Sequence, residues 1–399
     1  MGDRDAHLVG VGMTKFGKAL DRTLGQLVEE ATRKALDDAR IEPGSVECIF
    51  SSNSVAGLIT GQESVRGQVA LKGTGISGCP VFNVDNACAS GSTALHMARC
   101  YVAAGYADVA LVVGFEKMYH PDKAQTLKAL ESATDVAEVA ELRERMGADS
   151  GSRSIFMDFY ASKVRGYLER TGAPPRVLAQ IAAKNHGNGA LNPLAQYRTA
   201  HDVEAVLASR PIVSPLTLLM CSPFSDGAAA LVVASSRWCR LNGGQGPRLL
   251  GSGVASESFA AEQSQMAALA RRVYEQAGIR PADIDVMEVH DAAAPGELFA
   301  YEDMGLAEPG AGWRLVEEGA VHLGGRVPVN PSGGLMARGH PIGATGVAQV
   351  CELVWQLRGT AGERQVKGAR IGVAHNRGGQ ITTKPTTGSA AMSVTVLAA

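Results

Sequence analysis

The sequence contains no C-x-x-C pair, no apolar run long enough to span a membrane and no large excess of charge of one sign. Its seven cysteines (48, 79, 88, 100, 221, 239 and 351) are scattered through apolar segments, which argues against a zinc site and a disulfide framework. The 38 basic and 40 acidic residues give a net charge of −2, so neither nucleic acid nor an anionic membrane is an expected partner. Because the first residues also lack the apolar core of a secretory signal, we expect a cytoplasmic protein that acts on a small molecule.

The chain has enough apolar material for a large core, because 45% of its 399 residues are hydrophobic. An apolar run at 7–12 predicts a strand, and Thr23 stands where it can cap a helix over 24–40. A Pro-Gly turn at 43–44 leads to a second predicted strand at 46–51. This order of elements is typical of an α/β protein.

The same unit of helix, proline turn and strand recurs 238 positions later. Residues 39–43 and 46–47 (Ala-Arg-Ile-Glu-Pro, Val-Glu) match 277–281 and 284–285 (Ala-Gly-Ile-Arg-Pro, Ile-Asp). We therefore expect a duplicated fold, with one half over residues 1–240 and the other over 241–399.

An insertion interrupts the first half at about 115–215. It contains a charged helical stretch at 131–145 and predicted loops at 185–187 and 191–193, and it is expected to cover a site. After it, residues 222–233 predict a turn, a glycine-rich entry and a buried strand that ends the first half.

Cys88 stands at the predicted start of a helix. Unpaired backbone N–H groups and the positive end of the helix dipole favour a thiolate there, which is the nucleophilic form. A free cysteine is more often a small buried apolar residue, but residues 89–94 are unusually small, as a closely approaching substrate or backbone would require. A shift of 252 positions aligns Cys88 with His340. The same shift aligns Gly91 with Gly343 and Thr93 with Thr345. If the halves pack about a pseudo-two-fold axis, a Cys/His pair forms where they meet.

Three histidines stand at predicted element ends. His290 follows an apolar strand at 286–289, His340 lies in a glycine-rich stretch that opens a helix, and His375 follows a strand at 369–374. A structural role is the alternative for each, and it is strongest for His375. A metal site is disfavoured, because His290 and Asp291 are adjacent rather than spaced along one helix face.

The motifs resemble those of the thiolase superfamily, in particular the thiolases of sterol-carrier-protein type. The resemblance extends over essentially the whole chain and rests on Asn-Ala-Cys-Ala-Ser-Gly around Cys88, on 222–230, on His290-Asp291, on 330–346, on Trp-Gln-Leu-Arg-Gly at 355–359 and on His375-Asn376.

This resemblance implies a fold with five layers, α-β-α-β-α, a loop domain over the active site and a homodimeric core. It implies acyl-CoA and CoA as substrate and cosubstrate, with no bound cofactor and no metal. It also implies an acyl-enzyme on Cys88, His340 as the activating base, and an oxyanion hole at the positions of His290 and His340. Contacts to coenzyme A are expected within the glycine-rich segments, at Ser332, Gly333 and Gly343.

The sequence departs from the family at the second acid/base, which is usually a cysteine. Asn376 stands at one family position for this cysteine and Ala292 at the other, with Ala293 in place of an aromatic residue. The expected catalytic set is therefore Cys88, His340, His290, His375 and Asn376, with a histidine or a held water moving the second proton.

The two alanines also leave room for a bulky acyl group, unless Phe299 or the unusual segment 378–393 fills the space. The expected reaction is thiolytic cleavage of a 3-oxoacyl-CoA or the reverse condensation. One alternative is a retro-aldolase or CoA-independent acyltransferase that works with a zinc-ribbon/OB-fold partner subunit. Another is an acyl-CoA-binding subunit without catalysis, although such a subunit has no use for a paired nucleophile.

Overall fold

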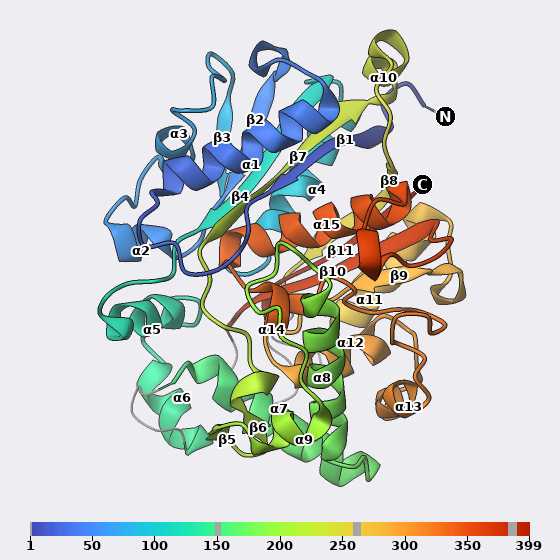
Figure 1. The fold of residues 1–399 in the computed structure, drawn as a ribbon. Helices are drawn as coiled ribbons and strands as arrows, with labels where there is room; N and C mark the ends of the chain where they lie inside the picture. Colours follow the sequence, from blue (N-terminus) through green and yellow to red (C-terminus); the bar gives the residue numbers. More distant parts are fainter. Residues whose placement is uncertain (1, 148–152, 258–264, 382–388) are drawn as a thin grey trace.

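A nine-stranded sheet, in the order β3-β2-β4-β7-β1-β8-β11-β10-β9, organises the fold. The structure is a computed structural model that describes residues 2–147, 153–257, 265–381 and 389–399 (Figure 1). The strands of the first half are β1 (Ala6–Met13), β2 (Cys48–Ser52), β3 (Val81–Val84), β4 (Val109–Glu116) and β7 (Gly227–Ser235). Those of the second half are β8 (Arg248–Ala255), β9 (Val286–Glu288), β10 (Ile371–Gln380) and β11 (Ser389–Ala398).

The two halves of the sheet have the same topology. In the first, β2 and β4 are parallel, and β7 and then β1 continue the sheet in antiparallel pairings. In the second, β9 and β10 are parallel, and β11 and then β8 follow in the same way. The pair His7–Arg248 joins β1 to β8 at the centre of the sheet. In the second half, the place that corresponds to β3 is taken by a single bridge between Met287 and Val329. The predicted duplication is confirmed.

Four helices complete the layers. Helix α1 (Leu24–Ala39) covers the first half of the sheet, and α11 (Gln265–Ala277) covers the second. Between the halves lie α4 (Ser90–Ala103) and α15 (Ile342–Arg358), each in contact with strands of both halves (Figure 1). The order of layers is therefore α-β-α-β-α, as expected.

Both sequence repeats are structural repeats. Helices α1 and α11 end 238 residues apart, and the two proline-initiated 3₁₀ turns after them keep this spacing. Helices α4 and α15 begin 252 residues apart. Small residues let these central helices approach: a Cβ on Gly91 would lie 2.9 Å from the backbone nitrogen of Val347, and one on Gly346 would lie 2.5 Å from that of Ser92. The small residues after Cys88 thus serve contact with another backbone.

The insertion is largely helical and lies at one end of the molecule (Figure 1). It comprises α5 (Lys123–Glu131), α6 (Val139–Met146), α7 (Ile155–Thr171), α8 (Arg176–Ala190), α9 (Val203–Ala208) and β5 (Pro211–Val213), which pairs with β6 (Leu216–Thr217). The remaining helices are α2 (Ala56–Thr60), α3 (Arg66–Ala70), α10 (Ser236–Asn242), α12 (Ala294–Asp303), α13 (Gly312–Glu317) and α14 (Gly334–Arg338). The expected boundary at 240 falls within α10.

Two local predictions are wrong. Residues 185–187 form part of α8 instead of a loop, because the buried Asn185 donates hydrogen bonds to Asp291 and Glu297 across the helix interface. Tertiary contacts here outweigh the low helix propensity of Asn and Gly. His375 lies inside β10 instead of after it, because pairing with β11 extends the strand to Gln380. The segment 378–393, which the sequence marks as unusual, lies partly outside the described residues, because these omit 382–388.

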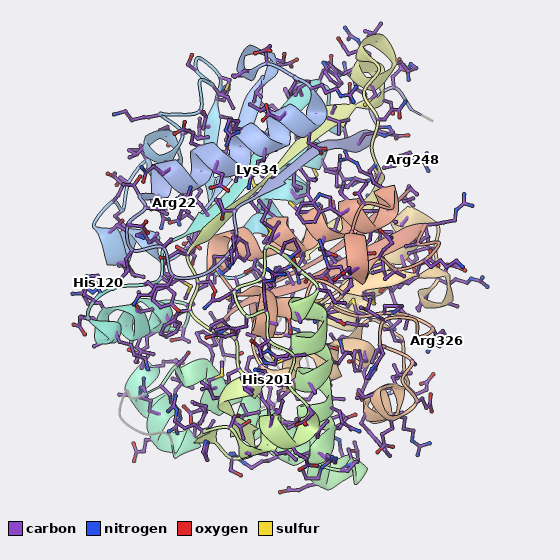
Figure 2. All side chains as sticks on the ribbon, viewed as in Figure 1. Arg22, Lys34, His120, His201, Arg248 and Arg326 are labelled. Carbon is purple, nitrogen blue, oxygen red and sulfur yellow. The ribbon has the colours of Figure 1, made fainter. Side chains whose placement is uncertain are left out.

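Basic side chains are found on several parts of the surface. Figure 2 shows Arg22, Arg248 and Arg326 on separate parts of the molecule. Among the described residues, no helix has the length and apolar character needed to cross a membrane. Both findings agree with the mixed charge of the sequence.

Candidate active site

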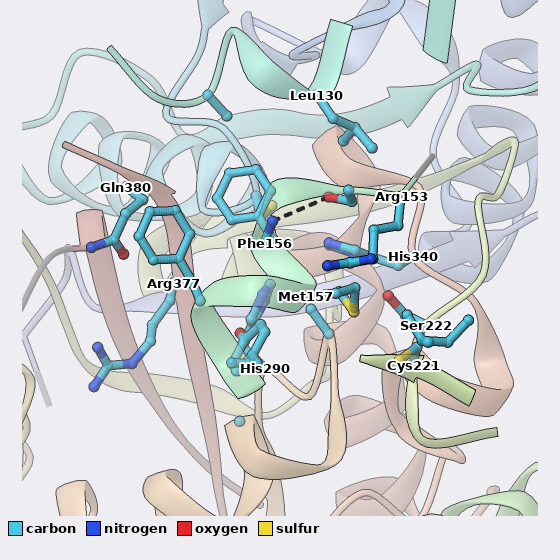
Figure 3. A pocket seen from close by; sticks show the side chains of 18 of the residues that line it. Leu130, Arg153, Phe156, Met157, Cys221, Ser222, His290, His340, Arg377 and Gln380 are labelled. Carbon is cyan, nitrogen blue, oxygen red and sulfur yellow. Dashed lines mark hydrogen bonds between the residues drawn. The ribbon is translucent and has the colours of Figure 1, made fainter. Parts of the chain in front are cut away.

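A cavity of about 840 Å³ brings together the loop domain and the ends of both halves. Cys88, His290 and His340 all line it, and α7 forms much of the opposite wall. His340, Cys221 and Ser222 lie on one side and Arg377 on the other (Figure 3). The central residues of the sequence prediction therefore share one space, although they are far apart in the chain.

Cys88 lies in a tight turn two residues before the start of α4. Ala87 has φ 48°, a left-handed conformation that costs energy for a residue with a side chain. Ser90 braces the turn, because its hydroxyl donates to the Ala87 carbonyl at 2.6 Å and accepts from the Asn86 N–H at 2.8 Å. Gly378 of β10 packs against it so closely that a Cβ would lie 2.2 Å from the Asn86 carbonyl oxygen.

The surroundings of Cys88 favour the neutral thiol. Burial raises the pKa of the Cys88 thiol to about 12, and the carboxyl group of Glu116 adds to this shift. The backbone N–H groups of Gly379 and of Cys88 itself act in the opposite direction, but they do not outweigh burial. The N–H groups at the helix start act in the expected direction, but burial acts more strongly, so Cys88 depends on a base to become nucleophilic.

His340 is suited to be that base. Its Nδ1 lies 2.7 Å from the hydroxyl oxygen of Thr345, which also lies 3.0 Å from the carbonyl oxygen of Pro341. Both contacts are satisfied when the hydroxyl donates to the carbonyl and Nδ1–H donates to the hydroxyl, which leaves Nε2 with its lone pair. Burial, with added repulsion from His290 and Arg338, holds the pKa of His340 well below its usual range. The imidazole is thus neutral and able to accept a proton.

His290 completes a compact cluster. Its ring centroid lies 5.2 Å from that of His340 in an edge-to-face arrangement. One side-chain atom each of Cys88, His290 and His340 lie within 4.8 Å of one another. Burial and the charge of Arg377 lower the pKa of His290 to about 3, while contact with Asn376 partly offsets the shift. Both imidazoles next to the thiol are therefore neutral.

His375 and Asn376 lie behind this cluster and do not line the cavity. The backbone N–H of His290 donates to Nδ1 of His375 at 3.2 Å. The side chain of Asn376 contacts His290 and donates to Gln349 at 2.9 Å. The placement of both residues suits them to hold His290 in position.

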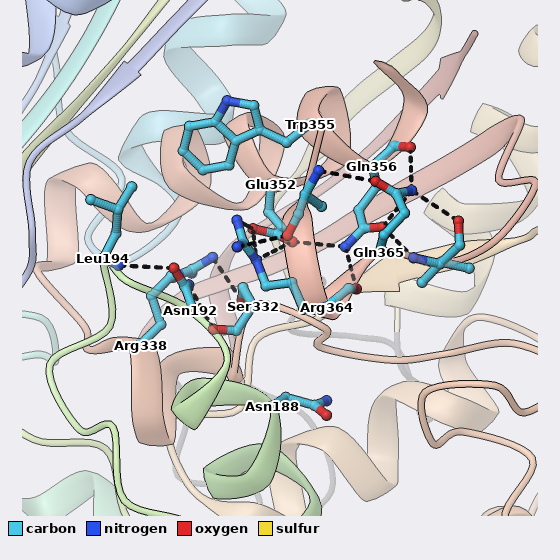
Figure 4. A network of polar contacts seen from close by, with 12 residues as sticks. Asn188, Asn192, Leu194, Ser332, Arg338, Glu352, Trp355, Gln356, Arg364 and Gln365 are labelled. Carbon is cyan, nitrogen blue, oxygen red and sulfur yellow. Dashed lines mark hydrogen bonds and ion pairs between the residues drawn. The ribbon is translucent and has the colours of Figure 1, made fainter. Parts of the chain in front are cut away.

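Ser332, Gly333 and Gly343 are buried and lie outside the cavity lining. Ser332 donates to Glu288, which pairs with the buried Arg338. Arg338 also donates to the Ser332 hydroxyl, as Figure 4 shows. Gly333 has φ 99° and packs against α8, and the N–H of Gly343 donates to Glu116. These contacts give the three residues structural roles, and the prediction that they touch coenzyme A gains no support.

Three residues that form part of the site have no signal in the sequence, because the insertion supplies them from α7: Tyr160, Lys163 and Tyr167. The hydroxyl of Tyr167 donates to Glu302 at 2.6 Å. Burial and the nearby Arg377 lower the pKa of Lys163 to about 8. Their spacing along a helix predicts that these residues share one face. It does not predict that this face borders the cavity that Cys88 lines.

The space left by Ala292 and Ala293 remains open in part. Ala292 lines the cavity, whereas Ala293 is fully buried. Phe299 also lines the cavity and packs on Tyr167 with ring centroids 5.8 Å apart. Gly378 lines the cavity too. Phe299 and the start of the segment 378–393 therefore form parts of the cavity wall, and they do not fill the cavity.

The cluster of Cys88, His290 and His340 could also hold a metal ion, because a thiol and two neutral imidazoles are suitable ligands for zinc. The sequence argued against a metal because His290 and Asp291 are adjacent instead of spaced along one helix face, and this pattern does not include Cys88 as a ligand. The acyl-transfer chemistry of a paired thiol and imidazole does not require one.

The duplicated five-layered fold, with a cysteine and two histidines where its halves meet, is typical of acyltransferases that work through a cysteine. Residues 6–203 match the thiolase N-terminal domain, and residues 253–387 match the thiolase C-terminal domain-like family. An acetyl-CoA acetyltransferase from Methanothermobacter thermautotrophicus is 38% identical over 383 residues, which cover 94% of this chain and 97% of the relative. This chain belongs to the thiolase family and is an acyltransferase of that family.

Further relatives show the breadth of the family. Sterol carrier protein 2 from Oryctolagus cuniculus is 37% identical, with 93% of this chain and 69% of that protein covered. A solved structure titled an Ltp2-ChsH2(DUF35) aldolase has a TM-score of 0.80 at 25% identity, covering 99% of this chain and 98% of that one. The dimeric peroxisomal thiolase of Saccharomyces cerevisiae has a TM-score of 0.71 at 17% identity, and the match covers 100% of this chain and 98% of that one. It shows the shared fold.

Proposed function

We propose that this protein cleaves a 3-oxoacyl-CoA with CoA, or catalyses the reverse condensation, through an acyl-enzyme on Cys88. The observation that carries the proposal is the neutral thiol of Cys88 beside the neutral imidazole of His340 at the cavity wall. A base that removes a thiol proton as attack begins activates a nucleophile that is inert at rest. A subunit that only binds acyl-CoA would gain nothing from this pair.

The first half-reaction starts when His340 accepts the proton of Cys88 and the sulfur attacks the 3-oxo carbon. Negative charge then develops on the carbonyl oxygen. The backbone N–H groups of Cys88 and Gly379 both favour negative charge at the sulfur, which makes them the donors suited to stabilise this oxygen. The bond between C2 and C3 breaks, which leaves the acyl group on Cys88.

Coenzyme A enters this proposal as a substrate, with no resident cofactor. Three exposed cations from the loop domain line the cavity: Lys123, Arg170 and Arg210. Exposed residues that line a cavity lie where it meets solvent, and cations at this place suit the phosphates of CoA. The pantetheine arm would then pass inward to Cys88.

A bulky acyl group fits the interior of the cavity. Its walls near the loop domain are mainly apolar, with contributions from Leu127, Leu130, Phe156, Met157, Phe159, Phe224 and Ile342. Ala292 removes bulk on the side of His290. Since burial of apolar surface contributes about 25 cal/mol per Å², such walls favour aromatic or branched acyl groups over an acetoacetyl chain.

A homodimer is supported by the edge of the sheet. Strand β3 is an end strand whose second edge is unpaired within the described sheet, and a free edge of this kind is suited to pairing. Near it, Val65, Val69 and Met97 are exposed by 56%, 42% and 38%. A second copy covering this edge would bury these side chains.

A retro-aldol reaction is the second candidate, and the structural likeness to an aldolase assembly favours it. The absence of cysteine from positions 292 and 376 also fits a chemistry other than ordinary thiolysis. In this case the protein would work with a zinc-ribbon/OB-fold partner subunit.

The two candidates differ in their need for free CoA. A 3-oxoacyl-CoA should be cleaved to two thioesters only when CoA is added, as chromatography of the products would show. Cleavage of a 3-hydroxyacyl-CoA to an aldehyde or ketone without added CoA would replace this proposal with the second candidate.

A further inference from the structure

We propose that Tyr160 is the proton donor and acceptor at the α-carbon of the substrate, in place of the missing cysteine. The inference rests on the proposed function, because it assigns a further step of the same reaction. Three observations carry it: the place of the ring, the state of the hydroxyl and the charges around it.

The ring of Tyr160 lies beside the segment where the family carries its cysteine. Tyr160 projects from α7 into the cavity that Cys88 and His290 line. A Cβ on Gly296 would lie 3.3 Å from the ring carbon Cε1 and 2.7 Å from the His290 carbonyl oxygen. The ring therefore packs at the start of α12, near the peptide between His290 and Asp291, which precedes Ala292. Gly296 leaves the room for it.

The hydroxyl of Tyr160 makes no hydrogen bond with any residue that the structure describes. By contrast, the hydroxyl of Tyr167, two turns further along α7, is held by Glu302. A tyrosine hydroxyl in a cavity needs a partner, because desolvation without one is costly. Water or a ligand atom is the partner available on the cavity side.

The charges around Tyr160 suit a proton transfer near the sulfur. Tyr160 and Cys88 line the same cavity, so a substrate bound to the sulfur occupies the space that the phenol borders. Burial raises the pKa of Tyr160 above its usual range, so the resting group carries the proton that a carbanion must receive. Arg377 favours the phenolate, which stabilises the form left after the proton has moved.

The step balances without any further reagent. When the bond between C2 and C3 breaks, its electron pair stays on C2, and the Tyr160 hydroxyl gives C2 a proton to form acetyl-CoA. The phenolate then takes the thiol proton of the incoming CoA. The resulting CoA thiolate attacks the acyl group, Cys88 leaves as thiolate, and the imidazolium of His340 returns its proton.

The test compares Tyr160→Phe with the wild-type protein in two assays. Acetyl-CoA is incubated in D₂O with protein already acylated on Cys88, and deuterium in the acetyl methyl group is followed by mass spectrometry. Acylation of Cys88 is measured separately by intact mass in a single turnover with a nitrophenyl ester of the acyl group, whose leaving group departs as an anion and needs no proton from Tyr160. We expect Tyr160→Phe to slow exchange by about 10²- to 10⁴-fold while acylation stays within a few-fold of wild type.

Tyr197→Phe is the matched control, because Tyr197 lines the same cavity and is 42% exposed. It should keep both rates. Exchange that survives in Tyr160→Phe, or equal losses of exchange and acylation, would overturn the role of Tyr160. Failure of wild-type protein to acylate at Cys88 would instead overturn the proposed function.

Discussion

Cys88 and His340 occupy equivalent positions in the two halves, each two residues before the central helix of its half. Their side chains lie within 4.8 Å of each other. The duplication thus places the proposed nucleophile at one helix start and the proposed base at the other. Close contact between α4 and α15, at Gly91 and Gly346, fixes the distance between them.

Replacement of His340 by Ala should slow acylation of Cys88 by about 10²- to 10⁴-fold, because no base then takes a proton from a thiol whose pKa is about 12. Binding of acyl-CoA should weaken much less. Single-turnover acylation and equilibrium binding measure the two effects separately. Normal acylation in this variant near neutral pH would mean that the surroundings of Cys88 activate it without His340.

The rate of acylation should stay level as the pH falls through about 6.5, the usual histidine pKa. The reason is that burial lowers the pKa of His340, so it remains unprotonated and able to act as a base below that pH. The rate should fall only when the pH drops through the lowered pKa. Single-turnover acylation across this range tests the prediction, which an acid limb centred near 6.5 would contradict.

Gly346→Ala should destabilise the fold by about 1–3 kcal/mol, because the new methyl group would lie 2.2 Å from Oγ and 2.5 Å from the backbone nitrogen of Ser92. Gly187→Ala in α8 is the control, since a Cβ there meets nothing within 4 Å. It should leave the stability unchanged or raise it by up to about 1 kcal/mol. Urea unfolding compares the two, and equal stabilities would contradict close packing of the central helices.

Substrate size should matter at Ala292. We expect a higher kcat/KM for an aryl 3-oxoacyl-CoA than for acetoacetyl-CoA, and Ala292→Phe should reduce the first value more than the second. The added ring would take up cavity space beside His290. Steady-state kinetics with both substrates decide the point. A clear preference of the wild-type protein for acetoacetyl-CoA would remove the proposal of a bulky acyl group.

The sequence predicted those parts of the fold that repeat or carry strong local signals. Thr23 caps α1 through a capping box with Gln26, as the sequence predicted. The alignment of Cys88 with His340 predicted their contact, because duplicated halves place equivalent helix starts together. These predictions depend on local chemistry and on symmetry.

Features that depend on tertiary contacts could not be predicted from the sequence. The glycine-rich pattern around Ser332 is typical of a ligand loop, yet its hydroxyl serves a buried ion pair. His375 was expected at a strand end, but pairing with β11 continues through it. Tyr160 gave no signal because only the packing of α7 against α12 and β5 brings it to the cavity that Cys88 lines.

The measurement that tests the account most directly is intact mass after incubation with a panel of acyl-CoAs, comparing wild type with Cys88→Ala. Wild type should gain the mass of one acyl group, and Cys88→Ala should gain none. Cys221→Ala is the control, because Cys221 lines the same cavity and burial raises the pKa of its thiol to about 12 as well. It should acylate normally. An adduct that persists in Cys88→Ala, or disappears in Cys221→Ala, would contradict the assignment of Cys88 as the nucleophile.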